Sequence, residues 1–119
     1  MSKRILIVDD AAMMRAVLLE TLISLDIDVV GQARDGAEAV QMVEDLAPDI
    51  VLLDMEMPVM PGLDALKSIK IIRPETVVIM LTAAYSQEAI LGCIIAGAAD
   101  FINKQSFEDI AERLVPFLE

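Results

Sequence analysis

Histidine is absent from this chain of 119 residues. Its absence excludes Ser-His-Asp catalysis, zinc sites built on histidine and acid–base chemistry by an imidazole. Cysteine occurs only once, at Cys93, so the chain cannot form an internal disulfide. We interpret Cys93, which falls within a helical pattern, as a small buried hydrophobe rather than a reactive thiol. Any chemistry must therefore depend on carboxylates, hydroxyls and lysine.

Long hydrophobic runs are also missing, although 56% of the residues are apolar. The longest runs, Ile50–Leu53 and Thr76–Ala84, have the size of buried strands and fall short of the roughly 18 residues that a membrane span needs. The start of the chain leads into only four apolar residues before Asp9, which does not fit a secretory signal. We therefore expect a cytoplasmic protein that does not insert into a membrane.

Basic residues are scarce, since 9 of them stand against 20 acidic residues and the net charge is −11. Such a surface repels the phosphate backbone of nucleic acids. We therefore expect no direct nucleic-acid binding by this chain.

Short apolar runs alternate with helical patterns five times, which predicts an α/β fold with a parallel sheet covered on both faces. This arrangement fits a flavodoxin-like doubly wound sheet of five strands in the order 2-1-3-4-5, with five helices. No linker or repeat divides the sequence, so we expect residues 1–119 to form one domain.

The expected elements are bounded by caps, glycines and prolines. The strands are Arg4–Val8, Val29–Gln32, Ile50–Leu53, Val77–Leu81 and Asp100–Ile102. The first helix runs from about Ala12 to Leu25, and the second starts at Asp35, with Glu38 completing a capping box. The third ends at about Ile72 before Pro74. The fourth runs from the cap Ser86 to Gly97, and Ser106 with Asp109 opens the fifth.

Helical spacing predicts which side chains of two helices face inward. The predicted inward residues are Met14, Val17, Leu18 and Thr21 in the first helix, and Ile90, Cys93, Ile94 and Gly97 in the fourth. Leu91 and Ile95 fall outside the inward stripe of the fourth helix, as Leu19 and Ile23 do in the first. These residues are either apolar side chains scattered over the surface or part of a surface that binds a partner or a second copy of the chain, and we favour the binding surface.

Polar side chains follow the predicted strands where each strand ends. Asp9 and Asp10 follow the first strand, Asp54 the third, Thr82 the fourth and Lys104 the fifth. Ligands of open α/β sheets bind beyond the carboxyl ends of the strands, where the strand order reverses. We therefore expect these five side chains to lie on one rim.

Three carboxylates held close together repel one another unless a cation neutralises them. Mg²⁺ is the natural candidate because it accepts carboxylates, waters and phosphate oxygens. One carboxylate can then act as a nucleophile toward phosphorus, while Lys104 and Thr82 stabilise charge on the phosphoryl oxygens. The pattern predicts a phosphoryl and metal site.

Four stretches of the chain carry a resemblance to a known family. They are Ile5-Leu6-Ile7-Val8-Asp9-Asp10, Asp54-Met55-Glu56-Met57-Pro58-Val59-Met60-Pro61-Gly62, Leu81-Thr82-Ala83 and Ala96-Gly97-Ala98-Ala99-Asp100-Phe101-Ile102-Asn103-Lys104. Over nearly the whole chain they resemble the CheY-like receiver domains of response regulators in two-component signalling. The resemblance implies that Asp54 accepts a phosphoryl group from the phosphohistidine of a sensor histidine kinase.

The resemblance also implies a ligand set and a switch. Asp9, Asp10, Asp54 and the backbone carbonyl of Glu56 would surround Mg²⁺. Thr82 and Lys104 would bind the attached phosphoryl group. Phe101 matches an aromatic position that turns inward in the active state of the family, although a core phenylalanine is equally compatible with the sequence.

The resemblance implies partners as well. The first helix would dock the kinase, and the fourth would contact a downstream effector protein or output domain, with chemotaxis as one setting. Both a stand-alone regulator and a fragment of a longer one fit the sequence.

Two residues depart from the pattern of the family. Gln105 stands where proline usually follows the lysine through a cis peptide, and a cis bond without proline costs about 3 kcal/mol. Glu56 adds a negative charge beside the site, where it would compete for the metal or repel a phosphoryl group.

We therefore expect a signalling domain that catalyses only its own phosphorylation and slow hydrolysis. One alternative is a receiver-like binding module that is no longer phosphorylated, which Gln105 and Glu56 suggest. The other is an aspartyl-nucleophile phosphatase of the haloacid-dehalogenase-like class. That class needs an Asp-x-Asp pair after the first strand and usually a cap domain, and neither is found here.

Overall fold

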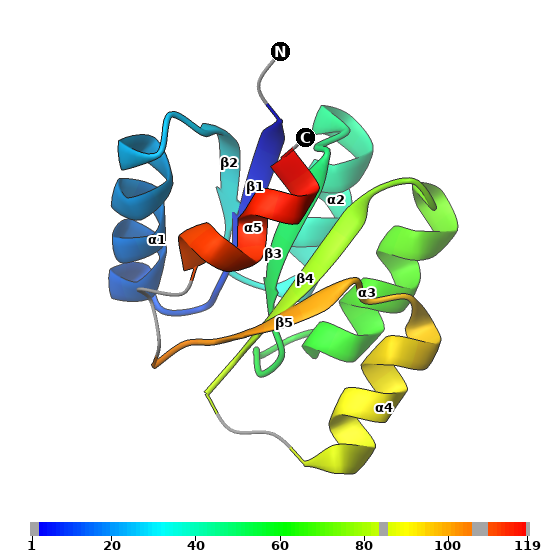
Figure 1. Ribbon diagram of the computed structural model, residues 1–119. Coiled ribbons are helices and arrows are strands. Elements are labelled where there is room, and N and C mark those ends of the chain that lie inside the picture. The colour runs from blue at the N-terminus through cyan, green and yellow to red at the C-terminus, as the bar shows by residue number, and fades with distance from the viewer. Residues whose placement is uncertain (1–2, 84–85, 106–109, 119) are drawn as a thin grey trace.

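The computed structural model describes residues 3–83, 86–105 and 110–118, along which five strands alternate with five helices (Figure 1). The strands are β1 (Arg4–Val8), β2 (Asp28–Ala33), β3 (Ile50–Asp54), β4 (Val77–Thr82) and β5 (Asp100–Asn103). The helices are α1 (Ala12–Ser24), α2 (Gly36–Leu46), α3 (Gly62–Ile72), α4 (Gln87–Ala96) and α5 (Ile110–Leu118). None of these helices is both long enough and apolar enough to cross a membrane.

The five strands form one parallel sheet in the order β2-β1-β3-β4-β5, which confirms the predicted fold. Ile5 of β1 pairs with Ile50 of β3, and Ile50 pairs with Val77 of β4, so the three central strands begin and end nearly level. Their carboxyl ends therefore meet at one edge of the sheet. The chain reverses its direction of winding between β1 and β3, where a crevice for ligands is expected.

The sheet separates two hydrophobic cores because successive residues of a strand point to opposite faces. On one face, α1 and α5 cover a core that includes Ile5, Ile50 and Ile79. On the other face, α2, α3 and α4 cover a core that includes Leu6 and Val51 (Figure 1). Both faces of the central strands are therefore buried, which explains why these strands read as continuous apolar runs.

Two of the predicted helix caps are present. The backbone N–H of Glu38 donates to the Asp35 side chain at 2.8 Å, and that of Ala89 donates to the Ser86 hydroxyl at 3.1 Å. Gly97 ends α4 with a φ of 107°, a left-handed conformation that glycine adopts without strain. The predicted start of the last helix at Ser106 and Asp109 lies outside the described residues.

The prediction of the inward residues is partly wrong in α1. Leu18 and the unpredicted Leu22 are fully buried, whereas Val17 is 38% exposed and Thr21 is half-buried. Leu19, expected outside, packs against the core. The helix is turned so that the two leucines, one turn apart, face the sheet.

The same kind of error occurs in α4. Cys93 is buried as predicted, and burial raises the pKa of its thiol, as for an inert structural cysteine. Ile94 is 53% exposed and Gly97 is also exposed, against the prediction. The small side chains of Cys93 and Ala96 pack in the core and Ile90 is half-buried, which leaves Ile94 and Ile95 outside.

The orientation of α1 can be tested by truncating one side chain on each face. Leu22→Ala should lower the free energy of unfolding by about 2–5 kcal/mol, because it opens a cavity in the core. Val17→Ala should cost less than about 1 kcal/mol, because Val17 is already in contact with water. Urea unfolding of both variants measures the difference, and equal losses would contradict this orientation.

Candidate functional site

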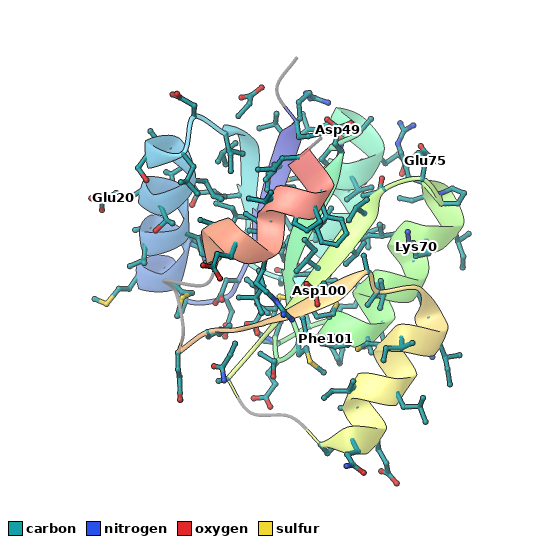
Figure 2. All side chains as sticks on the ribbon, viewed as in Figure 1. Glu20, Asp49, Lys70, Glu75, Asp100 and Phe101 are labelled. Atoms are coloured by element: carbon teal, nitrogen blue, oxygen red, sulfur yellow. The ribbon has the colours of Figure 1, made fainter. Side chains whose placement is uncertain are left out.

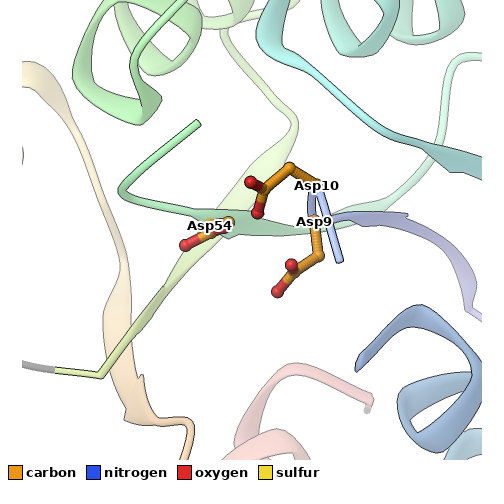
Figure 3. Close-up of side chains that lie close together, drawn as sticks. All are labelled: Asp9, Asp10 and Asp54. Atoms are coloured by element: carbon orange, nitrogen blue, oxygen red, sulfur yellow. The ribbon is translucent and has the colours of Figure 1, made fainter. Parts of the chain in front are cut away.

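Three carboxylates lie together at the carboxyl edge of the sheet. Asp9 directly follows β1, Asp10 comes next, and Asp54 is the last residue of β3. One carboxylate oxygen from each of them lies within 4.8 Å of the others (Figure 3). The predicted acidic cluster is therefore present, because β1 and β3 are adjacent parallel strands that end side by side.

The carboxylates differ in burial. Asp9 is fully buried and Asp54 is 3% exposed, whereas Asp10 is open to solvent. The backbone N–H of Ala11 donates to Asp9 Oδ1 at 2.9 Å, and Arg15 Nη1 donates to the backbone oxygen of Asp9 at 2.7 Å. Arg15 was not predicted to belong to the site, because only its place in the first turns of α1 brings it back over the end of β1.

Lys104 links the two buried carboxylates. Its Nζ lies 2.7 Å from Asp9 Oδ2 and 2.9 Å from Asp54 Oδ1. The backbone N–H of Lys104 donates to the backbone oxygen of Thr82 at 2.8 Å, which ties the lysine to the end of β4. The Lys104–Gln105 peptide is trans, and the Gln105 N–H donates to the Asn103 side chain at 2.8 Å. The lysine thus reaches the site without the proline that usually follows it.

Burial and charge set the protonation of this cluster. Burial raises the pKa of Asp54 from 3.8 to about 6, with repulsion from Asp9 adding to the rise and the hydrogen bond from Lys104 opposing it. Burial lowers the pKa of Lys104, but its contacts with both carboxylates outweigh this effect, so that its pKa lies above the usual value. The lysine is therefore charged at neutral pH.

The donor atoms fit a hard divalent cation. Among the residues that the structure describes, the buried Oδ2 of Asp54 has no hydrogen-bond partner. Among the described residues, one ammonium group, that of Lys104, contacts two of the three carboxylates, so the cluster keeps an excess of negative charge when all are ionised. A cation with oxygen ligands would relieve both the unpaired oxygen and the repulsion, and Mg²⁺ is suited to such a donor set.

A pocket of about 220 Å³ opens beside the cluster. Its lining includes Asp10, Asp54, Glu56, Thr82 and Lys104. Thr82 is only 2% exposed, and the exposed Ala83 next to it also lines the pocket. Four of the five polar residues predicted to share a rim therefore line one cavity large enough for a phosphoryl group, and the fifth, the buried Asp9, contacts Lys104.

Glu56 contributes its backbone to the site. Its N–H donates to Asp54 Oδ1 at 3.2 Å, while its side chain is exposed. The Glu56 carboxylate does not join the cluster formed by the other three.

The remaining predicted residues lie elsewhere. Phe101 is half-buried on β5 and packs against the core under α2, α3 and α4 (Figure 2). Leu91 and Ile95 are on α4, where they are 57% and 77% exposed. None of these three residues lines the pocket beside the carboxylates.

Comparison with known proteins gives one consistent family. A family model described as the response regulator receiver domain matches residues 5–115. The chemotaxis protein CheY of Thermotoga maritima is 45% identical over 104 residues, which make up 87% of this chain and 87% of that protein.

Two crystal structures share the fold. The response regulator domain of Thermotoga maritima CheB has a TM-score of 0.86 and 38% identity, and the match covers 98% of this chain and 92% of that one. A CheX-CheY-BeF₃-Mg²⁺ complex from Borrelia burgdorferi has a TM-score of 0.88 and 28% identity, covering 98% of this chain and 90% of that one.

The raised pKa of Asp54 makes a prediction about stability in the absence of metal. The unfolded chain releases the Asp54 proton near pH 3.8 and the folded protein near 6, so ionisation destabilises the fold increasingly as the pH rises through this window. Asp54→Asn removes that cost. We expect its stability advantage over the wild type to grow by about 2 kcal/mol between pH 4.5 and pH 7.5.

Urea unfolding in EDTA at the two pH values measures this growth. The exposed Asp28→Asn, which also removes one negative charge, serves as the control. If the stability advantage of Asp54→Asn over the wild type is the same at both pH values, burial of the ionised Asp54 carboxylate does not destabilise the fold.

Proposed function

Because this chain belongs to the response regulator receiver domain family, we propose that Asp54 is the residue at which it is phosphorylated. The observation that carries this proposal is the carboxylate of Asp54, buried beside Asp9 and Asp10 and in contact with Lys104. We further propose that residues 1–119 form one receiver domain that acts in the cytoplasm, where a histidine kinase supplies the phosphoryl group.

The proposed reaction is a transfer between two side chains. A carboxylate oxygen of Asp54 attacks the phosphorus of a phosphohistidine on the kinase, and the P–N bond breaks as the O–P bond forms. The imidazole leaves with the bonding electron pair and takes up a proton, and Asp54 becomes an acyl phosphate. Lys104 and the Thr82 hydroxyl are positioned at the pocket to stabilise charge on the phosphoryl oxygens.

Mg²⁺ is the proposed cofactor. Asp9, Asp10, Asp54 and the backbone carbonyl of Glu56 would hold it, and when bound it would neutralise charge on the transferring group. Support comes from the unpaired Asp54 Oδ2 and from the related CheX-CheY structure, which contains Mg²⁺ and BeF₃, a group with the shape of a phosphoryl group. Before the metal binds, Lys104 screens Asp9 from Asp54 and so keeps the carboxylates together.

The switch would follow from occupation of the pocket. Thr82 ends β4, and Lys104 and Phe101 lie at or near β5, so a phosphoryl group held by Thr82 and Lys104 joins these two strands. We propose that the side chain of Phe101 changes position when this happens. The changed surface would alter binding to a downstream effector protein or output domain, and the CheY relative makes chemotaxis a natural setting.

The two alternatives have distinct signatures. A receiver-like binding module would keep the cluster but remain unphosphorylated. A phosphatase would turn over an external phosphomonoester, whereas the proposed switch modifies only itself.

Incubation with acetyl phosphate and Mg²⁺ tests the acceptor. Intact-mass spectrometry should show one added phosphoryl group on the wild type, because acetyl phosphate can replace the phosphohistidine as donor. Asp54→Asn, and the wild type in EDTA, should show none. Asp28→Asn serves as the matched control and should be modified like the wild type.

The same experiment distinguishes the alternatives. An unmodified wild type would favour the binding module. Steady release of p-nitrophenol from p-nitrophenyl phosphate would favour the phosphatase, and a phosphoryl group retained by Asp54→Asn would move the acceptor to another residue.

The exposed face of α4 is the proposed partner surface. Leu91 and Ile95 are joined there by Ile94, so three large apolar side chains face solvent on one helix. The exposure of Ile94, which the sequence did not predict, makes this surface larger than expected. An exposed apolar surface of this kind is typical of a binding site for an effector protein or for a second copy of the chain.

Charge inserted into this surface should disrupt the association. We expect Leu91→Lys with Ile95→Lys to lower effector affinity at least tenfold, or to abolish a homodimer if the wild type forms one, because each ammonium would lose its hydration at the interface. Ile71→Lys is the matched control, since Ile71 is 80% exposed on α3. Binding assays and light scattering measure the effect, and a change equal to that of the control would rule out α4.

A further inference from the structure

The loop between β3 and α3, residues 55–61, packs closely against two glycines. A Cβ on Gly62 would lie 2.3 Å from the backbone oxygen of Asp54 and 2.7 Å from the Cα of Met55. A Cβ on Gly36, the first residue of α2, would lie 2.5 Å from the backbone oxygen of Met60 and 2.7 Å from its Cβ. Neither glycine has a left-handed φ, so space rather than backbone conformation requires glycine at both positions.

The loop holds a strained turn next to the second of these contacts. Val59 has a φ of 69°, and the Met60 N–H donates to the Pro58 backbone oxygen at 2.7 Å, which closes a γ-turn. A positive φ is unfavourable for a β-branched residue, and the Val59 side chain is 81% exposed, so its own packing offsets little of the strain. Such a conformation persists only where surrounding contacts impose it.

Glu56 lies between two fixed points of this loop. At one end, the Met55 N–H donates to the backbone oxygen of Leu81, and the Gly62 N–H donates to that of Met55, each at 3.0 Å. At the other end, Met60 rests against Gly36. Between Met60 and Glu56, the ring of Pro58 fixes its φ and the γ-turn constrains Val59, so few backbone torsions can absorb a displacement of Met60 before it reaches Glu56.

We propose that Gly36 is a positioning residue for the Mg²⁺ site, holding the loop in the conformation in which the Glu56 carbonyl would bind the metal. This inference rests on the proposed function, in which that carbonyl is a ligand. Gly36 belongs to α2 and not to the carboxylate cluster, so it acts through Met60. A methyl group there pushes the Met60 oxygen away by about half an ångström before the contact becomes tolerable.

The size of the expected effect follows from the geometry of the ion. Mg²⁺ requires nearly octahedral ligands at about 2.0–2.1 Å, so a ligand displaced by a few tenths of an ångström loses much of its contribution. Residues that orient metal ligands typically change metal affinity about 10–100-fold when they are replaced. We expect Gly36→Ala to weaken Mg²⁺ binding about tenfold.

Isothermal titration with Mg²⁺, together with the rise of Tm with Mg²⁺ concentration, measures this binding without any phosphoryl donor. Gly31→Ala is the matched control, because a Cβ there would meet the ends of flexible side chains rather than backbone, those of Leu46, Leu6 and Met42 at 3.2, 3.3 and 3.6 Å. We expect weak Mg²⁺ binding for Gly36→Ala and wild-type binding for Gly31→Ala. Equal affinities of Gly36→Ala and wild type, or equal losses in both variants, would overturn it.

If Gly36→Ala does not fold, a second pair of variants tests whether the contact between Gly36 and Met60 positions the metal site. Met60→Ala removes the part of the Met60 stem beyond Cβ, whose Cγ packs at Gly36. Met42→Ala removes the same atoms from a methionine of the same hydrophobic core that is not among the nearest atoms a Cβ on Gly36 would meet. Met60→Ala should weaken Mg²⁺ binding several-fold more than Met42→Ala, and equal affinities would overturn the inference.

The wild type separates failure of the inference from failure of the proposed function. A wild-type protein that does not bind Mg²⁺ would overturn the metal site and the role of Gly36 together. A wild type that binds Mg²⁺ while Gly36→Ala binds it equally well would overturn the role of Gly36 alone.

Discussion

The contact of Lys104 with Asp9 and Asp54 is the interaction on which the rest of this site depends. Two carboxylates buried side by side repel each other, and the ammonium group at 2.7 and 2.9 Å offsets that repulsion. The offset is incomplete, because the pKa of Asp54 remains raised to about 6 and its Oδ2 lacks a hydrogen-bond partner among the described residues. The site is therefore held together yet left short of positive charge, which suits it to a cation.

The fold offsets the cost of burying these charges by placing them at the rim of a rigid sheet. The central strands are buried on both faces, and their apolar residues lock the register that brings Asp9 and Asp54 level. Backbone hydrogen bonds then fix the flanking segments, with Lys104 tied to β4 and Met55 tied to the same strand. Packing several residues away thus offsets the repulsion between the carboxylates, just as the contact between Gly36 and Met60 holds the loop beside the site.

The errors of the sequence interpretation have a common cause. Helical spacing placed Val17 and Ile94 inside, yet Leu22 is buried in α1 and small residues are buried in α4, because spacing alone does not fix the rotation of a helix about its axis. How closely a helix approaches the sheet decides which side chains fit beneath it, and that distance is a property of the assembled layers. Gln105 does not prevent Lys104 from reaching the site, because the backbone hydrogen bond from Lys104 to Thr82 holds the lysine in place.

The sequence by itself determined the five strands, the caps of α2 and α4 and the group of polar residues at the carboxyl edge, while the strand order followed from the fold that these βα units fit. These features depend on local periodicity and on the rule that parallel strands end together, so neighbouring residues carry the information. Only the tertiary structure decided which oxygens Lys104 contacts, that Arg15 returns to the backbone of Asp9, and that Gly36 rests on Met60. Each of these is a distance between residues far apart in the chain or in different elements, and such distances are set by how the layers pack.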